Sequence, residues 1–385
     1  MHPPKALYIH IPFCKHRCHY CDFNTYVLEG QPVDAYLNAL EREMERTVSA
    51  LPPGRIDTVF VGGGTPTVLT PAQMERFLGA VRRWFPVAPD AEFTVEANPG
   101  TTGPELLAVM RAGGVNRISF GVQAFDDALL ERIGRIHDTD DVYRSIELAR
   151  EAGFANISID LMFGLPGQTM DLLADSVRRA VELDLPHYSL YGLKIEENTL
   201  FHVLYERNEL PLPSEEEELQ MYLFIMERLE AAGRRQYEIS NFALPGFESR
   251  HNMTYWRNEP YYGIGAGAHG YARGVRHVNI KGVTPYIEAA GKRLPRLSEE
   301  RVDEREAMED FMMVGLRMRA GVRDADFAAQ FGGRSIDDVF GGVIGRLRDA
   351  GLLERRPDGA GWRLTERGIP LGNEVFGAFV GALEG

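Results

Sequence analysis

Short runs of apolar and β-branched residues alternate with longer segments of helical periodicity along the first half of the chain. Six strand-like runs precede residue 194, at 7–11, 56–61, 92–97, 116–120, 157–162 and 188–193. Between them, apolar residues recur every three or four positions over 35–49, 72–84, 105–112, 141–152 and 172–183, as in helices with one buried face. This rhythm predicts a parallel sheet of βα units with right-handed crossovers. An open doubly wound sheet and a full or partial (β/α) barrel both fit it.

The second half of the chain follows a different pattern. A helix is predicted over 214–232, because Ser214 suits an N-cap and four glutamates follow it. The stretch 242–274 is rich in glycine and aromatic residues, and a break lies near 291–298. Beyond the break the pattern predicts helices over 299–319, 324–331 and 335–350, then a strand, a turn and a strand over 351–364. These last elements resemble a small winged-helix-like unit, so we expect two domains, 1–290 and 299–385.

Charge and composition narrow the classes of function. The 385 residues include 42 basic and 56 acidic side chains, for a formal net charge of −14. No excess of Lys and Arg is available for phosphate contacts, so we expect no nucleic acid partner. No apolar run reaches the ~18 residues of a membrane span, and the first residues lack the pattern of a secretory signal. We therefore expect a cytoplasmic protein without a transmembrane segment.

Distinctive motifs follow nearly every predicted strand. In parallel βα architectures the carboxyl ends of the strands share one face, where binding and active sites gather. In chain order the motifs are PFCKHRCHYC, GGGTPT, EANP, GVQ, GLPGQT and YGL. Six such motifs on one rim predict a binding or active face there.

The cysteines carry the most specific chemistry. All three in the chain lie in one short window, at Cys14, Cys18 and Cys21. A disulfide would leave one thiol over, and disulfides are rare in the cytosol. Zinc is a stronger alternative, because His10, His16 or His19 would complete a Cys₃His site. Iron–sulfur clusters also take cysteine ligands, and three cysteines on a four-iron cluster leave one iron open to chelate the amine and carboxylate of a molecule such as S-adenosylmethionine.

The glycine run Gly62–Gly64 supports a ligand at the same rim. Without Cβ atoms, these residues let the backbone approach a ligand closely. A plain turn would need fewer glycines. Phosphate binding is disfavoured, because the Lys-Ser/Thr pair of a phosphate-binding loop is absent.

Together these motifs resemble a known family. The spacing Cys14-x3-Cys18-x2-Cys21, with Tyr20 before the third cysteine, is similar to the signature of radical S-adenosylmethionine proteins. With YIHIPFC, CDFNTY, GGGTPT, EANP, GVQ and GLPGQT, nearly the whole chain resembles the oxygen-independent coproporphyrinogen dehydrogenase (HemN-like) branch, and within it the heme-chaperone (HemW) family. The resemblance implies an α/β fold, a partial (β/α)6 barrel with a C-terminal helical, winged-helix-like domain.

The resemblance also implies cofactors and the residues that hold them. Cys14, Cys18 and Cys21 would bind a [4Fe–4S] cluster. Glycine backbone and polar side chains would bind S-adenosylmethionine, with Asp160 at the ribose hydroxyls and Lys194 contacting the nucleoside through its backbone. The implied S-adenosylmethionine residues are Tyr8, Tyr20, Gly63, Gly64, Thr65, Glu96, Gln123, Arg135, Asp160 and Lys194.

Two departures from the dehydrogenase pattern separate the possible functions. The dehydrogenases carry a fourth cysteine two residues after the third, where this chain has Phe23. They also have a long extension before the first strand, whereas Cys14 lies near the start of this sequence. Both departures favour a heme chaperone that delivers heme to hemoproteins. The alternative is a coproporphyrinogen dehydrogenase or another radical enzyme acting on a tetrapyrrole, and enzymatic activity stays open.

A further motif, HNxxYW at residues 251–256, is associated with heme binding in the resembling family. An imidazole can ligate heme iron, aromatic faces can flank a porphyrin, and Arg250 could pair with a propionate. We expect a mobile, glycine-bordered segment that holds heme through His251, Asn252, Tyr255 and Trp256. A structural loop is the alternative, and His269 and His277 are alternative iron ligands. The implied partners are heme and recipient hemoproteins, including respiratory enzymes at the membrane; a homodimer stays open.

Overall fold

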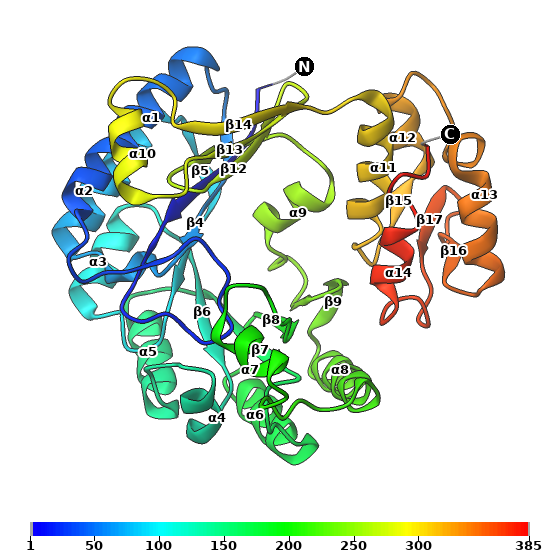
Figure 1. Ribbon diagram of the computed structural model, residues 1–385, viewed down its shortest axis with the longest axis horizontal. Helices are drawn as coiled ribbons and strands as arrows, with labels where there is room; N and C mark the ends of the chain where they lie inside the picture. The colour runs from blue at the N-terminus through cyan, green and yellow to red at the C-terminus, as the bar shows by residue number, and fades with distance from the viewer. Residues whose placement is uncertain (1–2, 384–385) are drawn as a thin grey trace.

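The computed structural model describes residues 3–383 and consists of a curved, helix-covered sheet beside a smaller C-terminal unit (Figure 1). Six parallel strands lie side by side in chain order within a 12-stranded sheet. They are β1 (Ala6–Ile11), β4 (Ile56–Gly63), β5 (Val87–Ala97), β6 (Arg117–Gln123), β7 (Asn156–Phe163) and β8 (His187–Gly192). The expected partial (β/α)6 barrel is confirmed.

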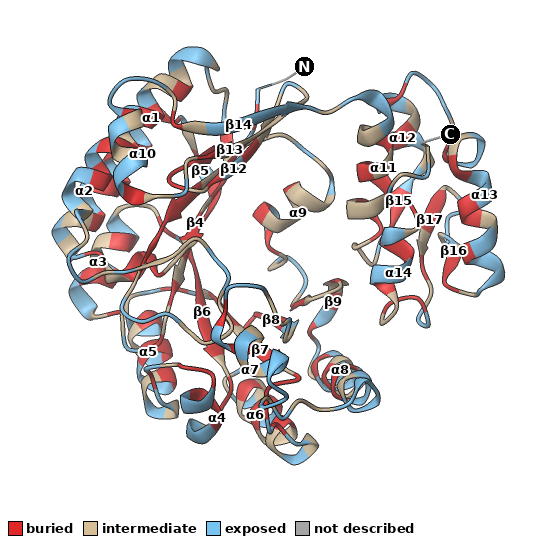
Figure 2. Ribbon diagram, in the orientation of Figure 1, coloured by how far each residue is buried: buried red, intermediate tan, exposed pale blue. Residues whose placement is uncertain are grey.

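Helices cover the outer side of these strands, and their buried faces form the main core together with the strands (Figure 2). They are α1 (Val33–Ala50), α2 (Pro71–Trp84), α3 (Pro104–Ala112), α5 (Thr139–Glu151), α6 (Met170–Glu182) and α8 (Glu215–Ala231). Thr70, Asp138 and Ser214 begin three of them with capping boxes. The first five match the segments predicted from apolar periodicity, and α8 begins at the predicted cap, Ser214. The pattern missed the short elements η1 (Pro66–Val68), α4 (Asp127–Arg132) and α7 (Leu200–Glu206).

The sheet continues beyond both ends of the barrel. Past β8 lie the antiparallel strands β10 (Asn241–Ala243) and β9 (Arg235–Glu238). Past β1 lie β11 (Tyr261–Ile264), β12 (His269–Ala272), β13 (Val275–Asn279) and β14 (Arg296–Arg301). Strand β11 runs parallel to β1, and the next three form an antiparallel meander. The first strand of the chain therefore lies inside the sheet, between β4 and β11.

The helix predicted over 299–319 is wrong at both ends. Residues up to Arg301 pair with β13, which overrides the helical propensity of the charged residues there. Helix α11 (Glu304–Gly315) begins only after Asp303, whose side chain accepts a hydrogen bond from the backbone N–H of Glu306. The sheet thus extends past residue 299, and the division into 1–290 and 299–385 stays a prediction.

The C-terminal unit has its own apolar core and a winged-helix-like arrangement. Helices pack around a three-stranded sheet of order β15-β17-β16. Besides α11, its elements are β15 (Val322–Arg323), α12 (Asp324–Gln330), α13 (Ile336–Asp349), β16 (Leu353–Arg355), β17 (Gly361–Leu364) and α14 (Gly372–Gly377). The expected C-terminal helical domain is confirmed.

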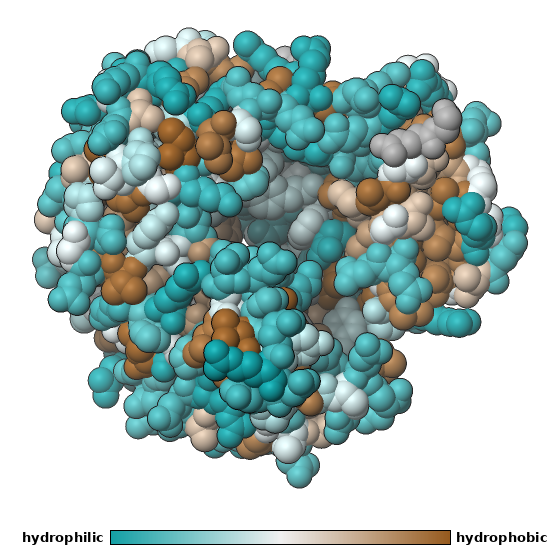
Figure 3. Space-filling view, viewed as in Figure 1, coloured by the Kyte–Doolittle hydropathy of each residue, from teal (hydrophilic) through white to brown (hydrophobic). Residues whose placement is uncertain are grey.

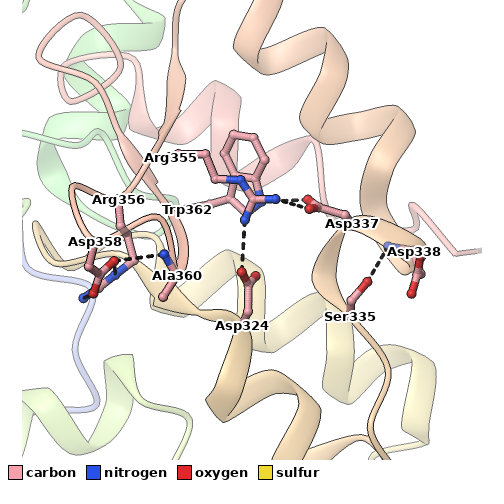
Figure 4. Close-up of polar contacts among 9 residues, drawn as sticks. All are labelled: Asp324, Ser335, Asp337, Asp338, Arg355, Arg356, Asp358, Ala360 and Trp362. Carbon is pink, nitrogen blue, oxygen red and sulfur yellow. Dashed lines mark hydrogen bonds and ion pairs between the residues drawn. The ribbon is translucent and has the colours of Figure 1, made fainter.

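Arginines of the β16–β17 hairpin are already paired within this unit (Figure 4). The Arg355 guanidinium lies 4.2 Å from the Trp362 ring centroid and donates to Asp324 at 3.0 Å. It also pairs with Asp337, which accepts from the Trp362 indole N–H at 2.9 Å. These contacts fix the hairpin to α12 and α13 and neutralise the cation that this hairpin would otherwise present.

The face shown in Figure 3 is mostly hydrophilic, and a deep hollow opens in it between the barrel and the C-terminal unit. Helix α9 (Arg250–Trp256) lies in the middle of the molecule, between the curved sheet and the C-terminal unit (Figure 1). Among residues 3–383, no helix is both long and apolar enough to cross a membrane.

A buried carboxyl group joins helix α1 to the extension of the sheet. Glu43 accepts hydrogen bonds from the Asn279 side chain at 2.6 Å, the Gly265 backbone N–H at 2.8 Å, and the Tyr286 hydroxyl of helix α10 (Val283–Ala290). Burial raises the pKa of Glu43 to about 7, from an ordinary value of 4.5. The folded chain therefore holds this proton more tightly than the unfolded chain does.

This imbalance makes stability depend on pH. Since the folded-state pKa exceeds the unfolded one, the free energy of unfolding should fall as pH rises from about 4.5 to about 7. Glu43→Gln should flatten the slope between pH 5 and pH 8 in urea denaturation, besides lowering stability overall. Glu45→Gln, on the exposed face of the same helix, is the matched control and should keep the wild-type slope. An unchanged slope in Glu43→Gln would contradict this assignment.

Candidate functional site

The three cysteines lie on a loop that is fixed at both ends. Strand β1 leads into β2 (Phe13–Cys14), which pairs with β3 (Tyr26–Val27) at the far end of the loop. The Asn24 amide donates to the carbonyls of Ala266 at 2.9 Å and Lys281 at 3.0 Å. The loop is therefore held against the chain segment that follows β11, and its thiols are free and partly exposed.

Two of the thiols contact residues outside the loop, one just after β4 and one just after α4. The Thr65 hydroxyl donates to Cys14 Sγ at 3.5 Å, and Arg135 Nη1 donates to Cys18 Sγ at 3.3 Å. Arg135 also donates to Asn98 Oδ1 at 2.7 Å and to the Gly121 carbonyl. Burial raises the pKa of Cys14 to about 11 and also raises that of Cys21. The loop and the strand ends thus form one polar rim.

The donor set suits a cluster better than a single ion. Among residues 3–383, no three His, Cys, Asp or Glu side chains converge on a position that one metal ion could occupy. A zinc ion needs such convergence, with each sulfur about 2.3 Å from the ion. A four-iron cluster takes one thiolate on each of three irons, so its ligands lie farther apart, and sulfur is the ligand it prefers.

The glycine run makes room for groups of the chain itself. Gly63 has φ +103°, and a Cβ there would lie 2.3 Å from the His10 ring. A Cβ on Gly62 would meet the Glu96 carboxylate at 2.4 Å, and one on Gly64 would meet the Phe13 carbonyl at 2.6 Å. The Gly63 N–H donates to Glu96 at 3.1 Å. Packing within the protein therefore requires these glycines before any ligand is considered.

Two carboxyl groups line the interior near the rim. Burial, and then the neighbouring Asp160, raise the pKa of Glu96 to about 8. Burial also raises the pKa of Asp160, which accepts a hydrogen bond from Ser119 at 3.3 Å. Tyr191 on β8 lies beside both carboxyl groups, yet 41% of it is exposed. Glu96, Asp160 and Tyr191 are thus only partly covered by the protein, as expected for side chains on the wall of a hollow.

Most of the residues implied for S-adenosylmethionine gather at this rim. Gln123, the last residue of β6, has φ 70°, a conformation that is strained for a residue with a side chain. Tyr20 lies on the cysteine loop with its ring centroid 6.5 Å from that of Phe201. Lys194 is exposed just beyond β8. The ends of β4, β5 and β6 and the turn after β4 carry Gly63, Gly64, Thr65, Glu96 and Gln123. Tyr8 and Asp160 lie within β1 and β7, and Arg135 follows α4. Their binding roles stay predictions.

The HNxxYW segment forms a capped helix in which His251 and Thr254 are buried, whereas its expected mobility stays a prediction. Ser249 caps α9 by accepting from the Asn252 backbone N–H at 3.3 Å. Glu92 on β5 accepts from the backbone N–H groups of Arg250 at 2.9 Å and His251 at 3.0 Å. A side-chain cap and a carboxylate at the positive end of the helix dipole thus stabilise a helix where the sequence suggested a loop.

His251 uses both of its ring nitrogens inside the protein. Nδ1 bonds to the Thr58 hydroxyl and Nε2 to the Tyr255 hydroxyl, each at 2.9 Å. Burial, and then the charge of Arg117, lower the pKa of His251 to about 3, so the imidazole is neutral. Ligation of iron by His251 would have to replace one of these bonds. Of the alternatives, His277 bonds to the Gly263 carbonyl at 3.3 Å and His269 is exposed.

A row of aromatic rings joins the rim to α9. Ring centroids are 6.3 Å apart for Tyr8 and Phe60, and 5.3 Å apart for Phe60 and His251. Tyr255 lies 5.1 Å beyond His251. Sequence reasoning missed Phe60, although its place in β4, two residues before Gly62, puts it on the face that carries the rim.

The last residue of the motif faces the C-terminal unit. The Arg317 guanidinium lies 4.4 Å from the Trp256 ring centroid and 5.5 Å from that of Phe376. Trp256 therefore joins α9 to the C-terminal unit through a cation–π contact.

Comparisons with known proteins agree with this architecture. The Radical SAM superfamily matches residues 8–180, and the HemN C-terminal domain matches residues 302–371, directly after β14. The heme chaperone HemW of Bacillus subtilis (strain 168) is 49% identical over 381 residues, which cover 98% of this chain and 100% of the relative. The heme chaperone HemW of Escherichia coli (strain K12) is 36% identical over 384 residues, covering 98% of each chain.

Among solved structures, coproporphyrinogen III oxidase (HemN) from Escherichia coli, described as a radical SAM enzyme, superposes with a TM-score of 0.86. The match covers 99% of this chain and 91% of that chain at 24% identity, which shows a common fold and no more. The near full-length relatives at 36% and 49% identity decide the family. The chain belongs to the HemW family of radical S-adenosylmethionine proteins.

Proposed function

We propose that this chain is a heme chaperone, which binds heme and delivers it to hemoproteins in the cytoplasm or at the membrane. The observation that carries the proposal is its similarity, over 98% of its length, to relatives named heme chaperones. Phe23 supports it, because the position of the dehydrogenases' fourth cysteine is an apolar side chain, 65% exposed. The likeness to a coproporphyrinogen oxidase is one of fold, so it does not favour that alternative activity.

We further propose that the rim holds a [4Fe–4S] cluster and S-adenosylmethionine. Cys14, Cys18 and Cys21 would ligate the cluster, which supplies an open iron for the amine and carboxylate of S-adenosylmethionine. Arg135 would stabilise thiolate character at Cys18, to which it already donates at 3.3 Å. Asp160 would hydrogen-bond the ribose diol, and Glu96 would make a polar contact to S-adenosylmethionine.

For heme, α9 offers aromatic surface and polar groups next to the hollow. His251 and Tyr255 share one hydrogen bond, so replacing either changes the other. Loss of Tyr255 would free His251 Nε2, whereas loss of His251 would leave the Tyr255 hydroxyl without its partner. The effects of the two replacements on binding or release would therefore be coupled.

Titration with hemin should give a saturable shift of the Soret band near one heme per chain, followed by transfer to apomyoglobin. Replacing both members of the His251–Tyr255 pair, as in His251→Ala with Tyr255→Phe, should impair binding or transfer more than either change alone. Arg144→Gln, on the exposed face of α5, is a matched surface control and should behave as wild type. Robust conversion of coproporphyrinogen to protoporphyrinogen by the reconstituted protein would overturn the proposal in favour of the enzyme.

A further inference from the structure

Arg117 is a buried cation without a partner. Its side chain is among the largest in the interior and is 2% exposed. Among residues 3–383 it forms no ion pair within 4 Å and no side-chain hydrogen bond, and its Nε is buried and unsatisfied. A guanidinium cannot release its proton to escape this cost. Burying an unpaired charge costs several kcal/mol, so a native protein that keeps one calls for an explanation.

The side chain points into the barrel. Arg117 begins β6, opposite Thr94 on β5 and Asn156 on β7. Successive side chains of a strand alternate between its faces, so Arg117 shares its face with Ser119, which donates to Asp160. Arg117 therefore lies one layer deeper in the barrel than the carboxyl groups at the rim.

No carboxylate among residues 3–383 forms an ion pair with Arg117 within 4 Å, although Glu92, on the same face of β5, acts on Tyr237 together with Arg117. Its field reaches Glu96 and Asp160 above it, and His187, Tyr237 and His251 beside it, because it shifts the pKa of each. The two acids lie beyond ion-pair distance. His187 and His251 cannot accept from it, since both ring nitrogens of each are already bonded, those of His187 to Ser158 at 2.7 Å and to Tyr237 at 2.9 Å.

The hollow offers a route to this charge. Tyr191, Glu96 and Asp160 lie on the wall above Arg117 and are reached by solvent. The charge of Arg117 also acts on His251, so α9, which carries the heme-associated motif, lies within reach of that charge. Arg117 itself is 2% exposed, so a ligand in the hollow would reach it only when the side chains that cover it move aside.

We propose that Arg117 is an anion-binding residue of the barrel interior and that it pairs with a carboxylate of the bound tetrapyrrole, one of the heme propionates. This assignment rests on the proposed heme-binding function and specifies how the ligand is oriented. An arginine fork suits a carboxylate because both form two parallel hydrogen bonds. A neutral lining would favour the porphyrin ring without fixing which edge enters first. Pairing with Arg117 would make the porphyrin enter with its propionate edge first.

A test uses hemin and hemin dimethyl ester, which has no free carboxylate, as probes of the full-length protein. Wild type should bind hemin about ten- to a hundredfold more tightly than the ester, the range expected for one charge-assisted pair. Arg117→Gln should lose hemin affinity by a similar factor and bind both probes equally. Arg117→Lys keeps the charge without the fork, so its preference should be intermediate. Arg144→Gln should keep the full preference.

The possible results separate the pairing from a structural effect. If Arg117→Gln weakens both probes equally and keeps the preference, the residue is structural and the proposal fails. If that variant does not fold, the ratio in Arg117→Lys decides, and an unchanged preference there overturns the proposal. Loss of the preference in Arg250→Gln instead would place the propionate at the exposed start of α9 and also overturn it.

A second carboxylate, that of S-adenosylmethionine, is distinguished by measuring its affinity in the same variants. We expect Arg117→Gln to change it much less than it changes hemin affinity. Arg117 reaches that site only through its charge on Glu96 and Asp160, whereas Arg135 lies at the rim. If Arg117→Gln loses S-adenosylmethionine affinity and keeps hemin affinity, Arg117 pairs with S-adenosylmethionine rather than with heme, and the proposal is overturned. If wild type binds no hemin, the proposed function itself fails. If wild type binds hemin with no preference over the ester, only this assignment fails.

Discussion

Cys18→Ala is expected to remove most of the iron and sulfide from anaerobically reconstituted protein. Wild type should hold about four iron and four sulfide per chain, the stoichiometry of a [4Fe–4S] cluster. Cys18 is the thiol that Arg135 contacts at the centre of the rim, so its loss removes one of three iron ligands and leaves Arg135 without a sulfur partner. Colorimetric iron and sulfide assays, with the absorbance near 400 nm, measure the effect.

His16→Ala is the matched control for this experiment. His16 lies on the same loop, is exposed, and would be one of the ligands of a Cys₃His zinc site. If the loop holds an iron–sulfur cluster, His16→Ala should keep the wild-type iron and sulfide content. Stoichiometric zinc without sulfide, in protein purified without air, would refute the cluster and favour the zinc alternative.

Gly63→Ala is expected to lower the free energy of unfolding by about 2–5 kcal/mol. A side chain at φ +103° is strained, and its Cβ would overlap the His10 ring at 2.3 Å. The His10 ring has little freedom to move away, because it is hydrogen-bonded to the Tyr8 hydroxyl and the Asn24 carbonyl, each at 2.9 Å. Urea denaturation followed by circular dichroism measures the change.

Gly79→Ala makes the same chemical change in open space. Gly79 lies within α2, has no atom within 4 Å of an added Cβ, and has an ordinary backbone conformation. Alanine there should stabilise the protein by about 0.5–1 kcal/mol, since it favours the helix and restricts the unfolded chain. A Gly63→Ala protein within 0.5 kcal/mol of wild type, an error range typical of such measurements, would contradict the packing described for the turn.

The barrel was predictable because each of its units carries a local signal. Residues 56–61 are apolar and β-branched, and residues 72–84 repeat apolar positions at helical spacing between Thr70 and Phe85. Such periodicity depends only on near neighbours in the chain, so it can be recognised without knowledge of the fold. The same logic failed at 299–301, because pairing with β13 depends on contacts that no local pattern encodes.

The motifs of the candidate site could be predicted from the sequence, but the burial of its residues could not. The rim motifs sit directly after strands, so topology alone brings them together. In contrast, His251 bonds to Thr58, a residue 193 positions away, and Glu92 holds the start of the same helix, so the burial of His251 depends on contacts distant in the sequence. Arg117 stands in a strand as one charged residue among apolar ones, a pattern that usually marks a solvent-facing position; here the inner face of the sheet is polar, so the usual inference fails.

The position of β1 within the sheet bears on how the protein is made. On the ribosome, β1 can pair with β4 early, but its other edge stays open until β11, beginning at Tyr261, has been synthesised. An open edge of a central strand is a template for association with other chains, so a fragment ending before β11 should aggregate. Asn24 likewise lacks its acceptors until Ala266 and Lys281 have emerged. The cysteine loop of the nascent chain therefore reaches its final anchoring late, and metal loading should follow translation of the whole barrel rather than accompany it.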